Sequence, residues 1–159
     1  MKKLTALLLL CSLLLTGCGT TPKEPVTFYY LNTNYEEDMS SAIGSELREA
    51  SGHREDLTYL LALYLMGPAG EDLVSPLPDS TTVLSVEHHG SNVTITLSEP
   101  TEVLTDAQFT MACSCLTLTC LELTTATNVT IKSGDHAVTL DTHHLLLQDL
   151  ITADKEEFQ

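Results

Sequence analysis

The stretch from Leu57 to Ser98 constrains the fold most, because its apolar pattern changes from helical to strand spacing at clear stop signals. Apolar residues first recur at helical spacing and predict one buried helix face, formed by Leu57, Leu60, Leu61, Tyr64 and Leu65. Gly67 and Pro68 then end the helix, because glycine suits the left-handed position after a helix and proline cannot continue it. Residues 83–86 and 93–97 alternate in polarity, which predicts two half-buried strands.

The sequence on either side extends this pattern into an α+β domain. The predicted strands are residues 26–31, 83–86, 93–97, 129–132 and 136–140, and the predicted helices are residues 57–66 and 105–123, with one or two helical turns within 40–50. The order is therefore βαββαβ with an extra C-terminal strand. It predicts a two-layer sandwich, with helices on one face of a small mixed sheet. We place one domain at residues 26–152 and an acidic tail at 153–159, with the segment from residue 145 forming either a short docking helix or an extended arm.

Residues 1–18 carry the most specific local motif. Lys2 and Lys3 precede an apolar run, residues 4–15, that is too short for a transmembrane helix of about 20 residues. The run leads into Leu15-Thr16-Gly17-Cys18, which resembles the bacterial lipobox, where a diacylglycerol is attached to the cysteine thiol and the chain is cut before it. We expect residues 1–17 to be a lipoprotein signal peptide and Cys18 to be lipidated. The alternative is an ordinary secretory signal in which Cys18 is incidental.

Residues 18–25 then form the lipidated cysteine and a short polar tether. Fully extended, the polar residues 20–25 span about 20 Å, so the domain begins close to the membrane. The predicted location is the outer face of the cytoplasmic membrane, with the diacylglycerol on Cys18 as the membrane contact.

Charge excludes one class of partner. The chain has 7 Lys and Arg against 22 Asp and Glu, a formal net charge of −15, and two of those lysines lie in the signal peptide. Nucleic-acid affinity depends on neutralising phosphates with Lys and Arg, so nucleic acid is excluded as a partner. An anionic lipid surface also repels such a domain and holds it off the membrane. The hydrophobic content of 43% is nevertheless sufficient for a packed core.

No pattern of histidines or cysteines indicates a metal or a cofactor. The pairs His88-His89 and His143-His144 are adjacent residues, which point to opposite faces of a strand and cannot ligate one metal together from regular β structure. Cys113, Cys115 and Cys120 lie on the second predicted helix. Residues two apart on a helix face about 200° away from each other, and residues seven apart are about 10 Å distant, so these spacings disfavour a disulfide. We interpret the three thiols as small core residues.

The sequence also lacks a recognisable catalytic arrangement. No G-x-S-x-G or S-x-x-K motif is present, and no glycine loop is typical of phosphate binding. Glu99 and Glu102 have no visible partner carboxylate for a glycosidase pair. We therefore expect no enzyme activity, no catalytic residue, no cofactor and no metal site.

Several segments together resemble a known bacterial module. They are Phe28-Tyr29-Tyr30, residues 60–68, Leu77-Pro78-Asp79-Ser80-Thr81 with residues 83–86, residues 93–98, and residues 116–119 followed by Val129, Ile131 and Gly134. Their order and spacing are similar to the GerMN domain of sporulation and spore-germination lipoproteins in Gram-positive bacteria. The sequence departs from the family in the Ser98-Glu99-Pro100 segment, in a second helix rich in Thr and Cys, and in carrying a single copy.

The resemblance implies a fold like the ring-building motifs of secretion and sporulation complexes, acting through protein–protein contact. The expected function is a non-enzymatic interaction domain in sporulation, germination or cell-envelope assembly, with a protein partner or a homo-oligomer. The predicted hairpin edge and the loop at residues 76–81 are the first places to look for a partner. The alternative is a lipoprotein that binds cell wall or a small carbohydrate, with Thr94, Thr96 and Thr130 offering hydroxyls on a sheet.

Overall fold

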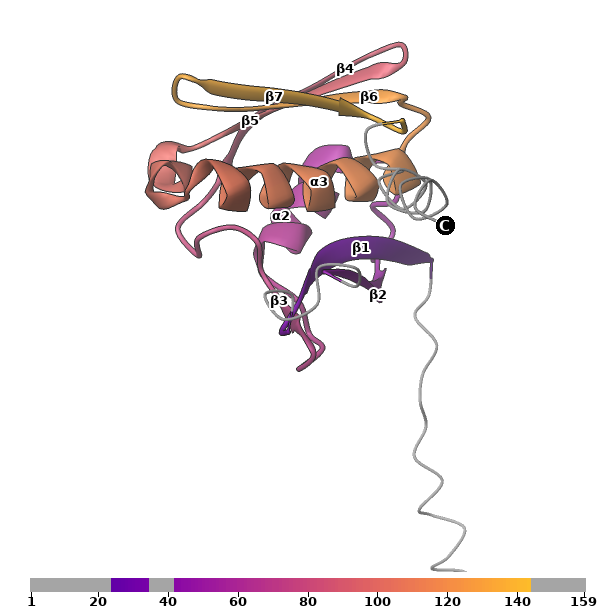
Figure 1. Cartoon of the computed structure of the whole chain (residues 1–159). Helices are drawn as coiled ribbons and strands as arrows, with labels where there is room; N and C mark the ends of the chain where they lie inside the picture. Colours follow the sequence, from indigo (N-terminus) through magenta and orange to yellow (C-terminus); the bar gives the residue numbers. More distant parts are fainter. Residues whose placement is uncertain (1–23, 35–41, 144–159) are drawn as a thin grey trace, which may run out of the picture.

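Two β-sheets enclose a layer of helices in the computed structural model, which describes residues 24–34 and 42–143 (Figure 1). The predicted signal peptide, Cys18, most of the tether, His144 and the acidic tail lie outside the described residues. Within the described part, no helix is both long and apolar enough to cross a membrane. The α+β class is confirmed, but the layers number three where the sequence suggested two.

The larger sheet has four strands in the order β4-β5-β6-β7. Its strands are β4 (Val83–His89), β5 (Asn92–Leu97), β6 (Asn128–Ser133) and β7 (His136–Asp141). The β5–β6 pair is parallel and the other two pairs are antiparallel, so the predicted mixed sheet with an extra C-terminal strand is present. Both helices lie against one face of this sheet, because Val93, Ile95, Val129 and Ile131 turn toward them and are fully buried (Figure 1).

The second sheet differs from the prediction. It has the order β2-β1-β3 and consists of β1 (Pro25–Asn32), β2 (Ile43–Glu49) and β3 (Leu73–Val74). The predicted helical turns within residues 40–50 are wrong, because this segment is the edge strand β2, antiparallel to β1. Its burial alternates with a period of two after Gly44: Glu46 and Arg48 are half-buried, whereas Leu47 is exposed. Strand β1 belongs to this second sheet and not to β4–β7. It covers the side of the helices that faces away from β4–β7 (Figure 1).

Helix α2 (Leu57–Leu65) follows the predicted boundaries closely. The Asp56 carboxylate caps it by accepting a hydrogen bond from Tyr59 N at 3.0 Å. The chain leaves the helix through Gly67, whose φ of 85° is the left-handed conformation predicted for that position. The helix buries the side chains of Leu60, Leu61 and Tyr64.

Helix α3 (Asp106–Leu123) is the central helix of the middle layer and contacts β1 on one side and β6 and β7 on the other. A short 3-10 helix, η3 (Glu99–Val103), connects it to β5. One of its threonines has a defined role: the Thr119 hydroxyl accepts a hydrogen bond from Tyr29 N at 3.0 Å. Strand β3 pairs with β1 only at the C-terminal end of β1. On the rest of that edge of β1, helix α3 supplies the acceptor for the Tyr29 N–H.

An aromatic cluster joins the second sheet to α2. The rings of Tyr30 and Tyr64 stack with centroids 4.6 Å apart, and Phe28 meets Tyr64 edge to face at 5.7 Å. The Tyr30 hydroxyl donates a hydrogen bond to the Tyr64 carbonyl oxygen at 2.9 Å. The Phe-Tyr-Tyr segment of the sequence thus supplies two of the three rings that lock β1 onto the helix layer.

Candidate functional site

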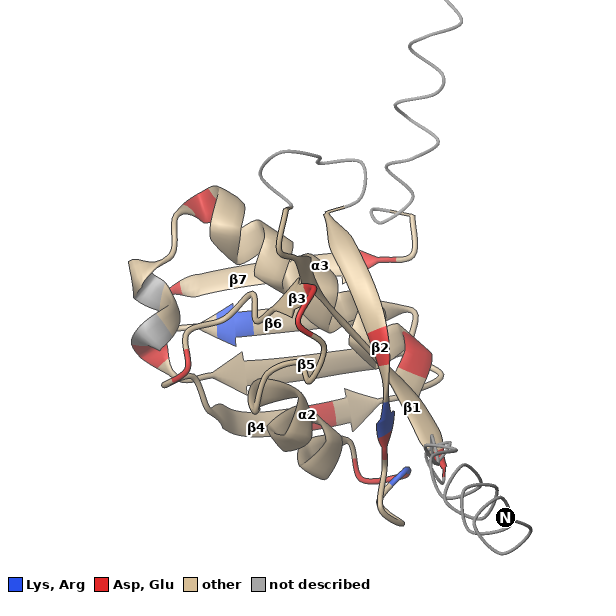
Figure 2. Ribbon diagram, turned by 90° about the horizontal axis from the view of Figure 1, so that it is seen from below, with Lys and Arg blue, Asp and Glu red and all other residues tan. Residues whose placement is uncertain are grey.

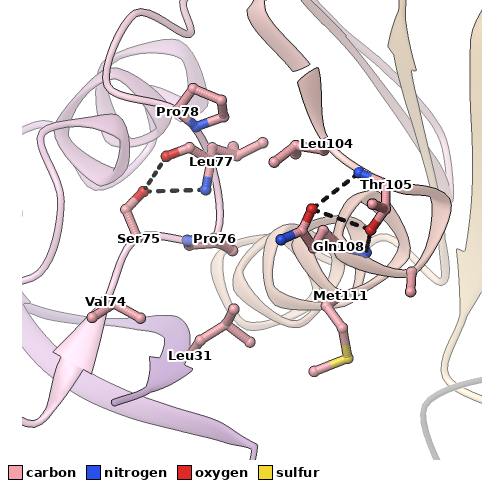
Figure 3. A pocket seen from close by; sticks show the side chains of 11 residues that line it. Leu31, Val74, Ser75, Pro76, Leu77, Pro78, Leu104, Thr105, Gln108 and Met111 are labelled. Atoms are coloured by element: carbon pink, nitrogen blue, oxygen red, sulfur yellow. Dashed lines mark hydrogen bonds between the residues drawn. The ribbon is translucent and has the colours of Figure 1, made fainter. Parts of the chain in front are cut away.

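A groove of about 440 Å³ lies between the loop that follows β3 and the N-terminal half of α3 (Figure 3). Most of its lining is apolar. The lining residues are Leu31, Val74, Ser75, Pro76, Leu77, Pro78, Leu104, Thr105, Ala107, Gln108 and Met111. The lining contains no Asp, Glu, His, Lys or Cys, so it offers no general acid or base, and the hydroxyls of Ser75 and Thr105 have no general base beside them in the groove. Its chemistry suits the binding of an apolar surface.

Local hydrogen bonds fix the loop side of the groove. The Ser75 hydroxyl donates to the Leu77 carbonyl oxygen at 3.0 Å and accepts from Leu77 N at 3.3 Å. Farther along, Thr81 N donates to the Pro78 carbonyl oxygen at 2.9 Å. With Pro76 and Leu77 buried and two prolines restricting φ, this wall is held in one conformation without regular secondary structure.

The helix side is fixed by a capping box at the start of α3. The Gln108 side-chain oxygen accepts hydrogen bonds from Thr105 N at 3.0 Å and from the Thr105 hydroxyl at 3.1 Å. Gln108 N in turn donates to the Thr105 hydroxyl at 3.3 Å. Gln108 is exposed, and its amide nitrogen is directed into the groove and makes no hydrogen bond to another described residue (Figure 3).

The groove floor comes from the second sheet. Leu31, near the end of β1, is 6% exposed, whereas its strand partner Val74 in β3 is 37% exposed. The groove is therefore formed by residues from three separate parts of the chain, brought together by the pairing of β3 with the end of β1.

The predicted partner loop at residues 76–81 lies only partly in the groove. Pro76, Leu77 and Pro78 line it, whereas the side chain of Thr81 is buried. Sequence reasoning missed the opposite wall on α3. The Thr105-x-x-Gln108 spacing is a recognisable capping box, and it was the one available signal for that wall.

The predicted hairpin edge is also present. Strand β4 forms one edge of the larger sheet, and an irregularity between Val83 and Ser85 leaves Leu84 64% exposed. The bulge interrupts the regular edge, which reduces its ability to pair with another strand. We therefore regard the groove as the stronger candidate for a binding site.

All the histidines in the described part of the chain are exposed. His88 pairs with Val93 and His89 with Asn92, so the two side chains lie on opposite faces of the sheet. In residues 24–34 and 42–143, no three His, Cys, Asp or Glu side chains are grouped to hold a metal ion. His143 is exposed as well, and its backbone nitrogen donates to the Asp141 carboxylate.

Cys113, Cys115 and Cys120 are free thiols buried in the helix layer. Burial raises the pKa of each of them to about 12. At Cys115 a backbone hydrogen bond lowers the pKa, but its effect is smaller than that of burial. Their interpretation as core residues is therefore confirmed.

The outer face of the larger sheet is polar. Glu87, Thr94, Thr130 and Thr139 are strand partners in one row across the four strands. The Thr130 and Thr139 hydroxyls form a hydrogen bond at 2.9 Å. The described strands place no Phe, Tyr or Trp on this face, which offers hydroxyls together with charged side chains such as Glu87 and Lys132.

The fold defines this protein as an α+β domain with a layer of helices between two β-sheets. The chain belongs to the Germane family, described as sporulation and spore germination, whose family model matches residues 27–139. The predicted membership in the GerMN group is therefore confirmed.

Solved structures of the same group share the fold. The tandem GerMN domains of the sporulation protein GerM from Bacillus subtilis align with a TM-score of 0.53 and 18% identity, over 73% of this chain and 40% of that one. The first GerMN domain of the same protein aligns with a TM-score of 0.51 and 13% identity, over 73% and 86%. The chain thus spans 40% of the length of the tandem structure. No curated protein sequence matches this chain.

Proposed function

We propose that this chain is a lipid-anchored, extracytoplasmic and non-enzymatic interaction domain that serves sporulation, spore germination or the assembly of a cell-envelope complex. The observation that carries the proposal is the groove, an apolar concave surface without catalytic side chains, in a member of the sporulation and germination family. Its partner is another protein or a further copy of this chain.

The lipobox-like segment that ends at Cys18 supports the anchor, and the start of the domain determines where the groove would lie relative to it. The Glu24 carboxylate accepts a hydrogen bond from Gly52 N at 3.1 Å, and Arg54 donates to the Pro25 carbonyl oxygen at 2.6 Å. The point at which the tether enters β1 is therefore fixed to the loop after β2. Leu31 lies at the other end of β1, so an anchor at Cys18 leaves the groove away from the tether.

Metabolic labelling with a palmitate analogue tests the anchor. We expect the wild-type chain to incorporate the label and to remain with the membrane, because the lipobox cysteine carries the diacylglycerol. The Cys18→Ala variant should incorporate none. Equal labelling of both variants would show that Cys18 is not the lipidated residue.

The native mass of the detergent-extracted protein tests the interaction. We expect wild type to migrate as a complex larger than the monomer and Val74→Lys to migrate as the monomer, because a charged side chain enters the groove. Leu84→Lys is the matched control, since it adds the same charge at an exposed leucine on β4, away from the groove. A monomer in wild type, or a loss of the complex in both variants, would contradict the groove as the contact.

The polar outer face of the larger sheet supports a second function, binding of cell wall or carbohydrate. Thr94, Thr96 and Thr130 lie on β5 and β6, and their in-register hydroxyls could bind sugar hydroxyls. Saturable sedimentation with purified cell wall that is abolished by Thr94→Lys with Thr130→Lys, but not by Val74→Lys, would establish this function instead.

A further inference from the structure

We infer that the groove binds an extended segment of a partner protein, with an apolar core and flanking Lys or Arg residues. The inference rests on the proposed interaction function and specifies its partner. Three features of the described residues carry it: the apolar lining, one oriented amide donor, and the acidic surface of the domain.

The amide donor indicates a peptide backbone. Two hydrogen bonds from Thr105 hold the Gln108 side-chain oxygen, and this fixes the direction in which its NH₂ group points. That group projects into the groove from a wall that is otherwise lined by Leu104, Thr105, Ala107 and Met111 (Figure 3). A backbone carbonyl of an extended segment is an acceptor that can enter such a groove while apolar side chains cover its lining.

The charge distribution indicates basic flanks. Acidic residues are spread over both sheets and the connecting loops, and the described chain has few basic residues (Figure 2). Arg48 is bound to the Glu46 carboxylate and the Gly67 carbonyl, and Arg54 is bound to the Pro25 carbonyl. A partner segment with Lys or Arg beside its apolar core gains from this field, both in encounter rate and in discrimination.

The same field disfavours the other occupants. A second copy of this chain would bring a domain of the same negative sign, because the whole chain carries a net charge of −15. An anionic lipid surface would be repelled for the same reason. We therefore assign the groove to a partner protein of different sequence and not to self-association.

Two synthetic peptides test the inference on residues 19–159. Both carry one apolar core of Leu, Val and Pro, flanked by lysines in one peptide and by glutamates in the other, and binding is measured by fluorescence anisotropy. We expect the lysine-flanked peptide to bind about tenfold more tightly at low salt, with the preference reduced in high salt by screening. Equal affinities, or no binding by either peptide, would overturn the inference.

Gln108→Glu separates the amide donor from general electrostatics. Glutamate keeps the acceptor oxygen of the capping box but replaces the NH₂ donor with a second oxygen. The added negative charge alone would strengthen binding of the lysine-flanked peptide, whereas loss of the donor should weaken it, by roughly fivefold or more. Thermal unfolding provides the control, because an intact cap predicts an unchanged Tm. Binding as tight as that of wild type in high salt, where the added charge is screened, would overturn the assignment of Gln108.

Val74→Lys and Leu84→Lys locate the binding. We expect the first variant to lose the lysine-flanked peptide and the second to bind it almost as wild type does; equal effects would place binding outside the groove. If the peptides do not bind as expected, the inference about the partner segment fails, whereas the proposed interaction function is tested separately by the native mass of the anchored protein. The two results are therefore distinguishable.

Discussion

The three buried cysteines show how environment decides what a residue can do. From the sequence, the spacing of Cys113, Cys115 and Cys120 disfavours a disulfide and predicts small core residues. In the structure they are inside the helix layer, where burial raises the pKa of each to about 12. The thiolate is the reactive form, so burial disfavours reaction of these thiols in the native protein.

Thiol reactivity tests this assignment in residues 19–159. We expect native protein at pH 8 to react with a thiol-specific disulfide reagent about a thousandfold more slowly than unfolded protein, because a pKa raised by three units lowers the thiolate fraction by that factor. The reagent should titrate all three cysteines once denaturant is added. Rapid reaction of one thiol in native protein would show that it is accessible and that its role extends beyond packing.

Glu46 is the residue that ties β2 to the loop after α2. Its partial burial raises its pKa, but hydrogen bonds from Arg48, Ala69 N and Gly70 N outweigh that effect, and the pKa lies below the ordinary 4.5. The Arg48 contact is 2.8 Å long. Because the pKa of Glu46 is lower in the folded protein than in the unfolded chain, its ionised form stabilises the fold at any pH above the unfolded-state pKa. This stabilisation is lost as the pH falls through the folded-state pKa.

Glu46→Gln should therefore lower the free energy of unfolding at pH 7 by about 1 to 2 kcal/mol, because charge-assisted hydrogen bonds are lost. The difference from wild type should shrink as the pH falls below about 4.5, where the wild-type carboxyl becomes protonated. Denaturant unfolding at several pH values measures it. Glu49→Gln, at an exposed position on the same strand, is the control and should have little effect. A difference between wild type and Glu46→Gln that does not change with pH would contradict this role for the carboxylate.

At the level of elements, the helices and the larger sheet were predictable and the second sheet was not. Helix α2 is encoded by its apolar spacing and by Gly67-Pro68, and the strands β5 and β6 by their alternation. These are local signals. Strand β2 was missed because much of its outward face is polar and its position depends on pairing with β1 and on the Glu46 contacts across the fold.

The groove was predictable only in part for the same reason. The proline-containing loop at residues 76–78 was visible as a special segment, and it does form one wall. The other walls depend on β3 pairing with Leu31 and on the direction of the Gln108 side chain. Both are long-range or geometric facts that one sequence without its fold does not contain. Lipidation of Cys18 remains a prediction, since that residue lies outside the described part.

Gly67 provides a test of how α2 ends. Its φ of 85° favours glycine, and a Cβ placed there would meet no atom within 4 Å, so Gly67→Ala isolates the backbone cost. We expect a loss of about 1 kcal/mol in the free energy of unfolding. Gly70→Ala is the matched control, because its Cβ would make an ordinary contact of 3.6 Å with Glu46 and its φ is not positive. Equal effects of the two substitutions, measured by denaturant unfolding, would contradict this account of the turn.

At the scale of the whole molecule, the central helices hold two sheets with different surfaces. The outer face of β4–β7 is polar, whereas the junction of β3, the 75–78 loop and α3 is apolar and concave (Figure 3). The tether enters β1 at one end and the groove lies at the other end of that strand. A chain anchored at Cys18 would therefore present its groove to a partner and not to the lipid.

In-cell photocrosslinking tests this account most directly. A photoreactive benzoylphenylalanine is placed at Val74 in the groove or, as the matched position, at Thr139 on the polar sheet face of the membrane-anchored chain. We expect irradiation to yield a discrete protein adduct from position 74 and none from position 139, and Gln108→Glu should reduce that adduct. A protein adduct from position 139 alone, or cell-wall material captured there with nothing at position 74, would contradict the groove as the interaction site.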